Sequence, residues 1–150
     1  MSSASLVKGE DILKYIPQRN PIVMVDSLFD CAETSATTGL SVSNVNEMFM
    51  ENGNFLEAGL IEHMAQSCAL HAGYAPYMSS AGKEKEPLVG FIAEVKSLTI
   101  NHLPSIDQKL TTKVEIVNEV MNINVVRCET KDETGPVCSC EMKIFLQPEE

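Results

Sequence analysis

The stretch LIEHMAQSCALHAG, residues Leu60 to Gly73, decides the fold of this chain of 150 residues. It predicts a helix that is apolar on almost every side, and such a helix must be enclosed by other elements rather than laid on a surface. A single carboxylate, Glu62, interrupts its first turns. Charged side chains are rarely buried without a partner or a task, so Glu62 is the first candidate functional residue.

The residues around this stretch suggest where the helix begins and ends. Asn54 fits an N-cap, and Glu57 follows it at the spacing of a capping box. Gly73 and Pro76 are typical stop signals. We therefore expect a helix from about Asn54 to about Tyr74.

The rest of the chain predicts mostly strands. A short amphipathic helix, KGEDILKYIP, precedes the first two strands, and four more strands follow a polar loop. One strongly curved antiparallel sheet folded around one helix is the simplest arrangement of these elements, an α+β domain that covers residues 1–150. The predicted strands are IVMVDSLFDC, SATTGLSVS, LVGFIAEVKSLTI, QKLTTKVEIVNEV, INVVRCETKD and PVCSCEMKIFL.

Composition excludes several classes of function. The formal net charge is -10 and only two arginines occur, so a nucleic-acid partner is not expected. No apolar run is long enough to span a membrane, and the N-terminus lacks the features of a signal peptide, so we expect a cytoplasmic protein. The five cysteines form no CxxC pair, which favours free, mostly buried thiols over a metal site.

Two segments resemble one enzyme family. YIPQRNPIVMVDSL (Tyr15 to Leu28) resembles the loop-strand segment of the (3R)-hydroxyacyl-acyl-carrier-protein dehydratases, whose pattern is L-P-H-R-x-P, a hydrophobic run and V-D. LIEHMAQ (Leu60 to Gln66) resembles the helix motif of the same family. These enzymes have the hot-dog fold, which matches the predicted element order over nearly the whole chain. Within the fold, the sequence is most similar to the divergent dehydratases of aryl-polyene and related pigment pathways.

The resemblance implies a mechanism without a metal or another cofactor. In this family a histidine accepts the α-proton of a 3-hydroxyacyl thioester, and a glutamate on the central helix protonates the departing hydroxyl group. A backbone N–H near the helix N-terminus polarises the thioester carbonyl. Glu62 matches the family's glutamate, and its apolar neighbours favour the protonated acid that this role needs.

The chain departs from the pattern at Gln18, which stands where the family has its histidine. Glutamine has a similar polar reach but cannot accept a proton. Pro17 and Arg19 match on either side, so a misalignment is not expected. Gln66 lies one turn after Glu62 on the same helical face; it either orients Glu62 or hydrogen-bonds backbone across a dimer, and we favour the second role.

We do not expect any of the three histidines to replace the missing base. His63 is adjacent to Glu62 and therefore about 100° away around the helix. It aligns with His71, and we interpret the pair as a stripe that faces the sheet or a dimer contact. His102 is expected at the surface near a strand end.

Three functions remain open. The chain is a dehydratase-like protein acting on acyl-carrier-protein or CoA thioesters, as a homodimer or as half of a heterodimer with a histidine-bearing hot-dog subunit. Alternatively, it is a thioesterase in which Glu62 activates water, or a non-catalytic protein that binds acyl thioesters or the carrier protein. An acyl carrier protein is acidic, so docking needs a local basic patch, for which Arg19, Lys83, Lys85 and Lys96 are candidates.

Overall fold

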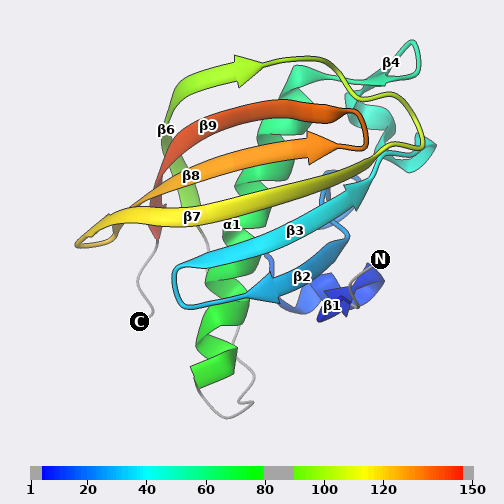
Figure 1. The fold of residues 1–150 in the computed structure, drawn as a ribbon. Helices are drawn as coiled ribbons and strands as arrows, with labels where there is room; N and C mark the ends of the chain where they lie inside the picture. Colours follow the sequence, from blue (N-terminus) through cyan, green and yellow to red (C-terminus); the bar gives the residue numbers. More distant parts are fainter. Residues whose placement is uncertain (1–4, 80–89, 147–150) are drawn as a thin grey trace.

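One curved antiparallel sheet wraps around one long helix in the computed structural model, which describes residues 5–79 and 90–146 (Figure 1). The seven strands of this sheet follow the order β1-β2-β3-β7-β8-β9-β6, and all neighbours are antiparallel. The α+β architecture predicted from the sequence is therefore confirmed. The strands of the sheet are β1 (Val7–Lys8), β2 (Ser27–Cys31), β3 (Ser35–Ser41), β6 (Gly90–Ile100), β7 (Lys109–Val120), β8 (Ile123–Asp132) and β9 (Gly135–Leu146).

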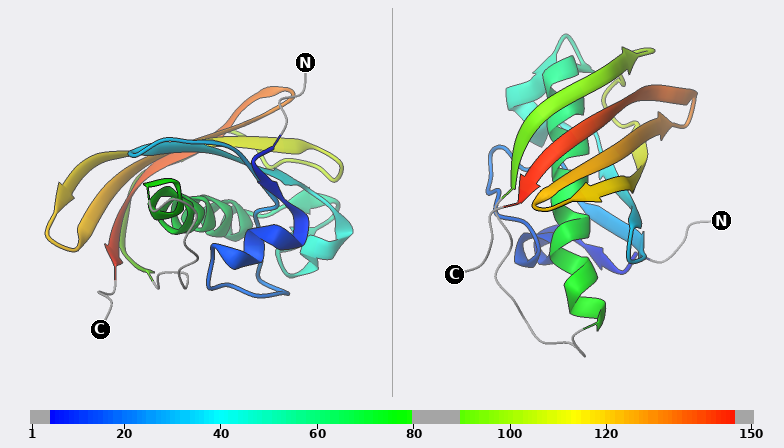
Figure 2. Two further views of the ribbon diagram at one scale, coloured as in Figure 1. Left: turned by 90° about the horizontal axis from the view of Figure 1, so that it is seen from below. Right: turned by 90° about the vertical axis from the view of Figure 1, so that its left-hand side faces the viewer.

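The helix α1 (Glu57–Ser79) lies on the concave side of the sheet, and the N-terminal segment covers another side of it (Figure 2). Burial alternates along β7, β8 and β9 because successive side chains point to opposite faces. The inward side chains pack with Leu60, Met64 and Leu70 of α1, which are all fully buried. The core is thus the space between the concave sheet and the helix.

The helix ends later than predicted and begins without the expected capping box. Asn54 lies in the short strand β5 (Asn54–Phe55), which pairs with β4 (Met50–Glu51), so it does not cap the helix. Leu60 N–H donates the first helical bond to Leu56. At the other end, α1 continues through Gly73 and Pro76 to Ser79.

Gly73 has a different role from the predicted stop signal. A β-carbon at this position would overlap the backbone carbonyl oxygen of Tyr15. The glycine therefore allows the N-terminal segment to lie directly against the helix.

The N-terminal half contains less strand than predicted. The predicted amphipathic helix is the 3₁₀ helix η1 (Gly9–Lys14), and a second one, η2 (Asn44–Phe49), follows β3. The strand expected from Ile22 begins only at Ser27. The four later strands lie within two residues of their predicted bounds, and β8 matches INVVRCETKD at both ends.

Strand β6 forms one edge of the sheet and pairs only with β9 among the described strands. Ten of its eleven residues are exposed, including the apolar side chains of Phe91, Ile92 and Leu98. A long edge strand with apolar side chains is a ready surface for pairing with another chain. Pairing with a second subunit at this edge stays a prediction.

The contact at Gly73 predicts the effect of adding one methyl group. Alanine has the higher helix propensity by about 1 kcal/mol, but Gly73→Ala is expected to lower the free energy of unfolding by about 1–3 kcal/mol because the methyl group collides with the Tyr15 carbonyl. Urea unfolding of the two proteins measures the difference. A stabilised variant would show that the two segments do not lie in contact.

Candidate active site

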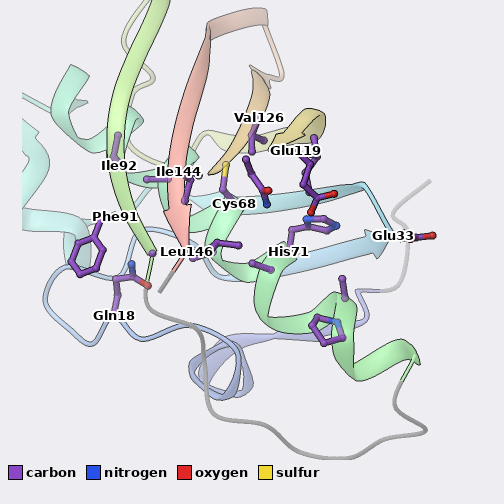
Figure 3. Close-up of a pocket in the computed structure, with 18 of the residues that line it drawn as sticks. Gln18, Glu33, Cys68, His71, Phe91, Ile92, Glu119, Val126, Ile144 and Leu146 are labelled. Carbon is purple, nitrogen blue, oxygen red and sulfur yellow. The ribbon is translucent and has the colours of Figure 1, made fainter. Parts of the chain in front are cut away.

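A cavity of 940 Å³ lies between α1 and the concave face of the sheet. Glu62 and Gln18 both line it, so the structure brings the two principal sequence candidates to one cavity. Figure 3 shows Gln18 near Phe91 on one side of the view, and His71 with Glu119 on the other. The walls between are apolar: Ala65, Ala69, Ala72 and Ala75 from the helix, and Ile116, Val126 and Ile144 from the sheet.

Glu62 reaches this cavity from the second turn of α1. Positions 62, 65, 69 and 72 follow the three- and four-residue spacing of one helical face, so the carboxylate and the alanines share the same wall. Gln66 Nε2 donates to Glu62 Oε2 at 2.9 Å. Oε1 of the same carboxylate has no hydrogen-bond partner among the described residues, which leaves it available to a ligand.

Gln66 is fully buried and holds the chain segment that follows Gln18. Its Oε1 accepts from Met24 N–H at 2.6 Å, and its Nε2 also donates to the Ile22 carbonyl at 2.7 Å. We expected Gln66 to bond backbone across a dimer, but the backbone it bonds belongs to its own chain. It also bonds Glu62, so one amide both orients the carboxylate and fixes the loop.

Gln18 lies in the loop that Gln66 anchors. Its Oε1 is buried and has no hydrogen-bond partner in the described part of the chain. Arg19 is exposed and turns back on the loop, with Nη1 donating to the carbonyls of Ile16 and Gln18 at 2.8 and 2.7 Å. Pro17 is half-buried between them. Arg19 therefore braces the loop, and only Gln18 of these three lines the cavity.

His63 is fully buried on the side of α1 that faces the sheet, as its position predicts. Its Nδ1 donates to the Met24 carbonyl at 2.7 Å, and its Nε2 accepts from the Thr112 hydroxyl at 2.7 Å. Thr112 in turn bonds Thr130 at 2.7 Å. Burial lowers the pKa of His63 to about 4, so the ring is neutral at pH 7 and serves as a structural hydrogen-bonding group.

The remaining histidines lie apart from Glu62. His71 is buried, bonds the Ala32 carbonyl through Nε2 at 2.9 Å and lines the cavity. His102 is at the surface as predicted, where its Nε2 lies 2.8 Å from Asp132 Oδ2. Of the basic residues considered for docking, Lys83 and Lys85 lie outside the described residues.

The cysteines are all free, and four of the five are buried, as expected. Burial raises the pKa of the Cys138 thiol to about 11, so it remains protonated and unreactive at neutral pH. Within the described ranges no three metal-ligating side chains gather at one point. No helix of the described part of the chain has the length and apolar character needed to cross a membrane.

Sequence reasoning missed the polar residues Glu33, Glu119 and Asn124, which line the cavity. Glu33 falls in the turn between the first two predicted strands, and the other two lie near the β7–β8 turn and were assigned only to strands. The signal was weak: Asn124 alternates with Val126 and Cys128 on the inward face of β8, which also carries Thr130. The contacts of His63 were also unforeseen because its partners lie 39 and 49 residues away in the chain.

Comparison with known proteins gives a family match. A model of the ApeP-like family, described as ApeP dehydratase, matches residues 10–150. The 3-hydroxyacyl-acyl-carrier-protein dehydratase FabZ of Shewanella amazonensis is 24% identical over 139 residues, covering 89% of this chain and 88% of that protein.

Among solved structures, the dehydratase heterocomplex ApeI:P from Xenorhabdus doucetiae is similar with a TM-score of 0.80 and 13% identity, over 92% of this chain and 91% of that one. A hypothetical thioesterase with coenzyme A from Streptococcus pneumoniae has a TM-score of 0.64 and 17% identity, over 82% and 86% of the two chains. At these identities the structural matches show the shared fold.

The bonds of Gln66 predict a large loss of stability when its amide is removed. In Gln66→Met the side-chain length is kept, but Met24 N–H and the Ile22 carbonyl lose their partner. Each unsatisfied buried group costs about 1–3 kcal/mol, so the free energy of unfolding should fall by roughly 2–5 kcal/mol. Denaturant unfolding measures it, and a change below 1 kcal/mol would contradict the anchoring role.

The buried neutral His63 predicts a dependence of stability on pH. Its pKa is about 4 in the folded chain against a reference of 6.5, so the unfolded chain binds the extra proton between these values. Stability is then fully present above pH 6.5 and falls by about 3 kcal/mol as the pH drops toward 4. His63→Gln, which does not titrate, should flatten this part of the stability curve. An unchanged slope would contradict the assignment.

Proposed function

We propose a function from one premise: the chain belongs to the ApeP-like dehydratase family. It is a dehydratase-like protein with an antiparallel sheet wrapped around one helix. Our proposal is that it supplies Glu62 as the acid of a dehydratase site on an acyl thioester, and that a histidine from a second hot-dog subunit supplies the base. The single observation that carries the proposal is the Glu62 carboxylate, oriented by Gln66 in a large apolar cavity.

In the proposed reaction, one group removes a proton from the substrate and the other donates a proton to it. The partner's histidine takes the α-proton of the 3-hydroxyacyl thioester, and the C–H electron pair forms the new double bond. The bond between C3 and the hydroxyl group breaks, and Glu62 gives that group its proton, so water leaves. The base then returns its proton to Glu62 by way of solvent, and the product is an enoyl thioester.

The N-terminus of α1 provides backbone N–H groups that could polarise the thioester carbonyl. Leu60 N–H makes the first helical bond, so the amide groups of Glu57, Ala58 and Gly59 precede the helical ladder. Amides at a helix N-terminus stabilise negative charge, such as the charge that develops on the thioester oxygen. These groups are our candidates for polarising the carbonyl.

Two features support a second subunit. Gln18 stands at the position where the family resemblance expects the base, and its unpartnered Oε1 cannot take a proton at neutral pH. The exposed edge strand β6 offers a surface for pairing. A similar fold occurs in a protein described as a dehydratase heterocomplex, which supports a heterodimer over a homodimer. In such a pair, only the site that joins Glu62 to the partner's histidine is complete.

The test combines this chain with a histidine-bearing hot-dog dehydratase subunit and a 3-hydroxyacyl thioester on acyl carrier protein, with enoyl formation as the readout. The chain alone should be inactive, and the mixture should turn over. Glu62→Gln should lower the rate of the mixture by about 10²-fold or more. Glu10→Gln is the matched control, because Glu10 is exposed and lies outside the cavity lining.

Two outcomes would contradict the proposal. If the partner is equally active alone, or with the Glu62→Gln chain, then Glu62 takes no part in the reaction. If the chain alone releases a free thiol from acyl thioesters, it is a thioesterase, because dehydration leaves the thioester intact. A further variant, Gln18→His, is tested in the isolated chain. Activity gained by this change would show that this chain can supply both the histidine base and the Glu62 acid.

A further inference from the structure

We propose that the end of the cavity away from Gln18 is a subsite for a neutral hydroxyl group at the remote end of the acyl chain. The proposed subsite consists of Asn124 and His71, with Glu119 at its edge; all three residues line the cavity. The inference rests on the proposed function, because it concerns the acyl group of the same thioester. It adds a preference for the chemical group at the remote end of the acyl chain, which neither the helix motif nor the cavity volume implies.

Asn124 is the principal observation. It lies on the inner face of β8, two residues before the buried Val126. Its side chain is 8% exposed, lines the cavity and makes no hydrogen bond to the described residues. The amide therefore keeps its donors and its acceptor available to a polar group of a ligand in the cavity.

His71 is the second buried polar group of the subsite. It is 4% exposed, and its Nε2 donates to the Ala32 carbonyl at 2.9 Å. In the neutral ring this bond fixes the proton on Nε2. The other ring nitrogen, Nδ1, has no partner within the described residues and is an acceptor.

Glu119 lines the same cavity as Asn124 and His71. It pairs with Asn124 across the β7–β8 ladder, and Figure 3 shows it on the same side of the view as His71. Glu119 is exposed, and no ion pair holds it within the described part of the chain. Glu33, also exposed, lines the same cavity. These two carboxylates make the end of the cavity unfavourable for an anionic ligand.

The donors and acceptors of the subsite select the ligand group. Asn124 offers two N–H donors and one acceptor, while His71 Nδ1 and the Glu119 carboxylate offer acceptors. A methyl group at the end of the acyl chain would leave these donors and acceptors unpaired. A terminal carboxylate would be repelled by the negative charge of Glu119. A hydroxyl group donates one hydrogen bond and accepts others, so it can bond Asn124 and an acceptor together.

The helix sets the length of acyl chain that reaches the subsite. Nine residues separate Glu62 from His71, which is about 13 Å along the axis at 1.5 Å per residue. Three bonds of an extended chain advance about 3.3–3.6 Å, so about twelve bonds separate the reacting carbon from the subsite. Shorter acyl chains should not be able to use it.

The experiment measures binding rather than turnover. Isothermal titration of the full chain, alone and with its partner subunit, uses saturated acyl pantetheine thioesters of equal length that end in a methyl, a hydroxyl or a carboxylate group. The hydroxyl-ended thioester should bind about tenfold more tightly than the methyl-ended one. The carboxylate-ended thioester should bind most weakly.

Asn124→Val tests the subsite directly. Valine suits an inward strand position and should keep the fold, which thermal unfolding checks, and the preference for the hydroxyl group should disappear while methyl-ended binding is kept. Glu119→Gln should improve binding of the carboxylate-ended thioester. The matched control is Asn101→Val, an exposed asparagine outside the cavity lining, which should leave the preference unchanged.

The outcomes separate this inference from the proposed function. Equal binding of the methyl- and hydroxyl-ended thioesters by the native chain would overturn the subsite and leave the dehydratase proposal intact. A preference that persists in Asn124→Val would also overturn it. Binding of none of the thioesters, alone or with the partner, would overturn both proposals.

Discussion

His63 and Gln66 hold the backbone from Ile22 to Met24 against the central helix, and the candidate site depends on that attachment. This segment lies beside a fully buried stripe of α1, yet it forms no strand that would satisfy its N–H and C=O groups. Buried backbone groups need partners, and these two side chains supply them. The same attachment sets the position of the loop that carries Gln18.

The cavity follows from the size of the side chains on one face of the helix. Leu60, Met64 and Leu70 lie on one face of α1, where they pack with inward side chains of the sheet and fill the core. Ala65, Ala69 and Ala72 lie on another face, and their small side chains leave space between the helix and the sheet. Glu62 lies on the same stripe as these alanines, so the cavity and the position of the carboxylate share one structural origin.

The features that sequence predicted well depend on local patterns. The alternation of INVVRCETKD predicts β8 at both ends because the period of a strand and its flanking turns are local properties. The helix end was predicted wrongly because Gly73 and Pro76 are local stop signals, whereas Gly73 is needed here for a contact with Tyr15. Contacts between segments that are far apart in the sequence cannot be predicted from the local pattern of either segment.

In the candidate site, too, residues within local motifs were predicted, whereas contacts between distant segments were not. Glu62 and Gln18 were found through motifs, and both line the cavity. The bonds of Gln66 to its own chain and the position of Asn124 depend on how segments far apart in the sequence meet. Asn124 was only one position of a predicted strand, and the folded sheet is needed to show that it lines a cavity.

Charge constrains how a protein of this kind could meet a carrier protein. The chain has a formal net charge of -10, so a homodimer would carry twice that charge and repel an acidic carrier protein. Arg19, the candidate cation nearest Gln18 in the chain, is engaged with the carbonyls of its own loop. A heterodimer removes this conflict if the histidine-bearing subunit also presents the basic surface. In the proposed heterodimer, one partner subunit would supply both the base that Gln18 cannot provide and a basic surface for the carrier protein.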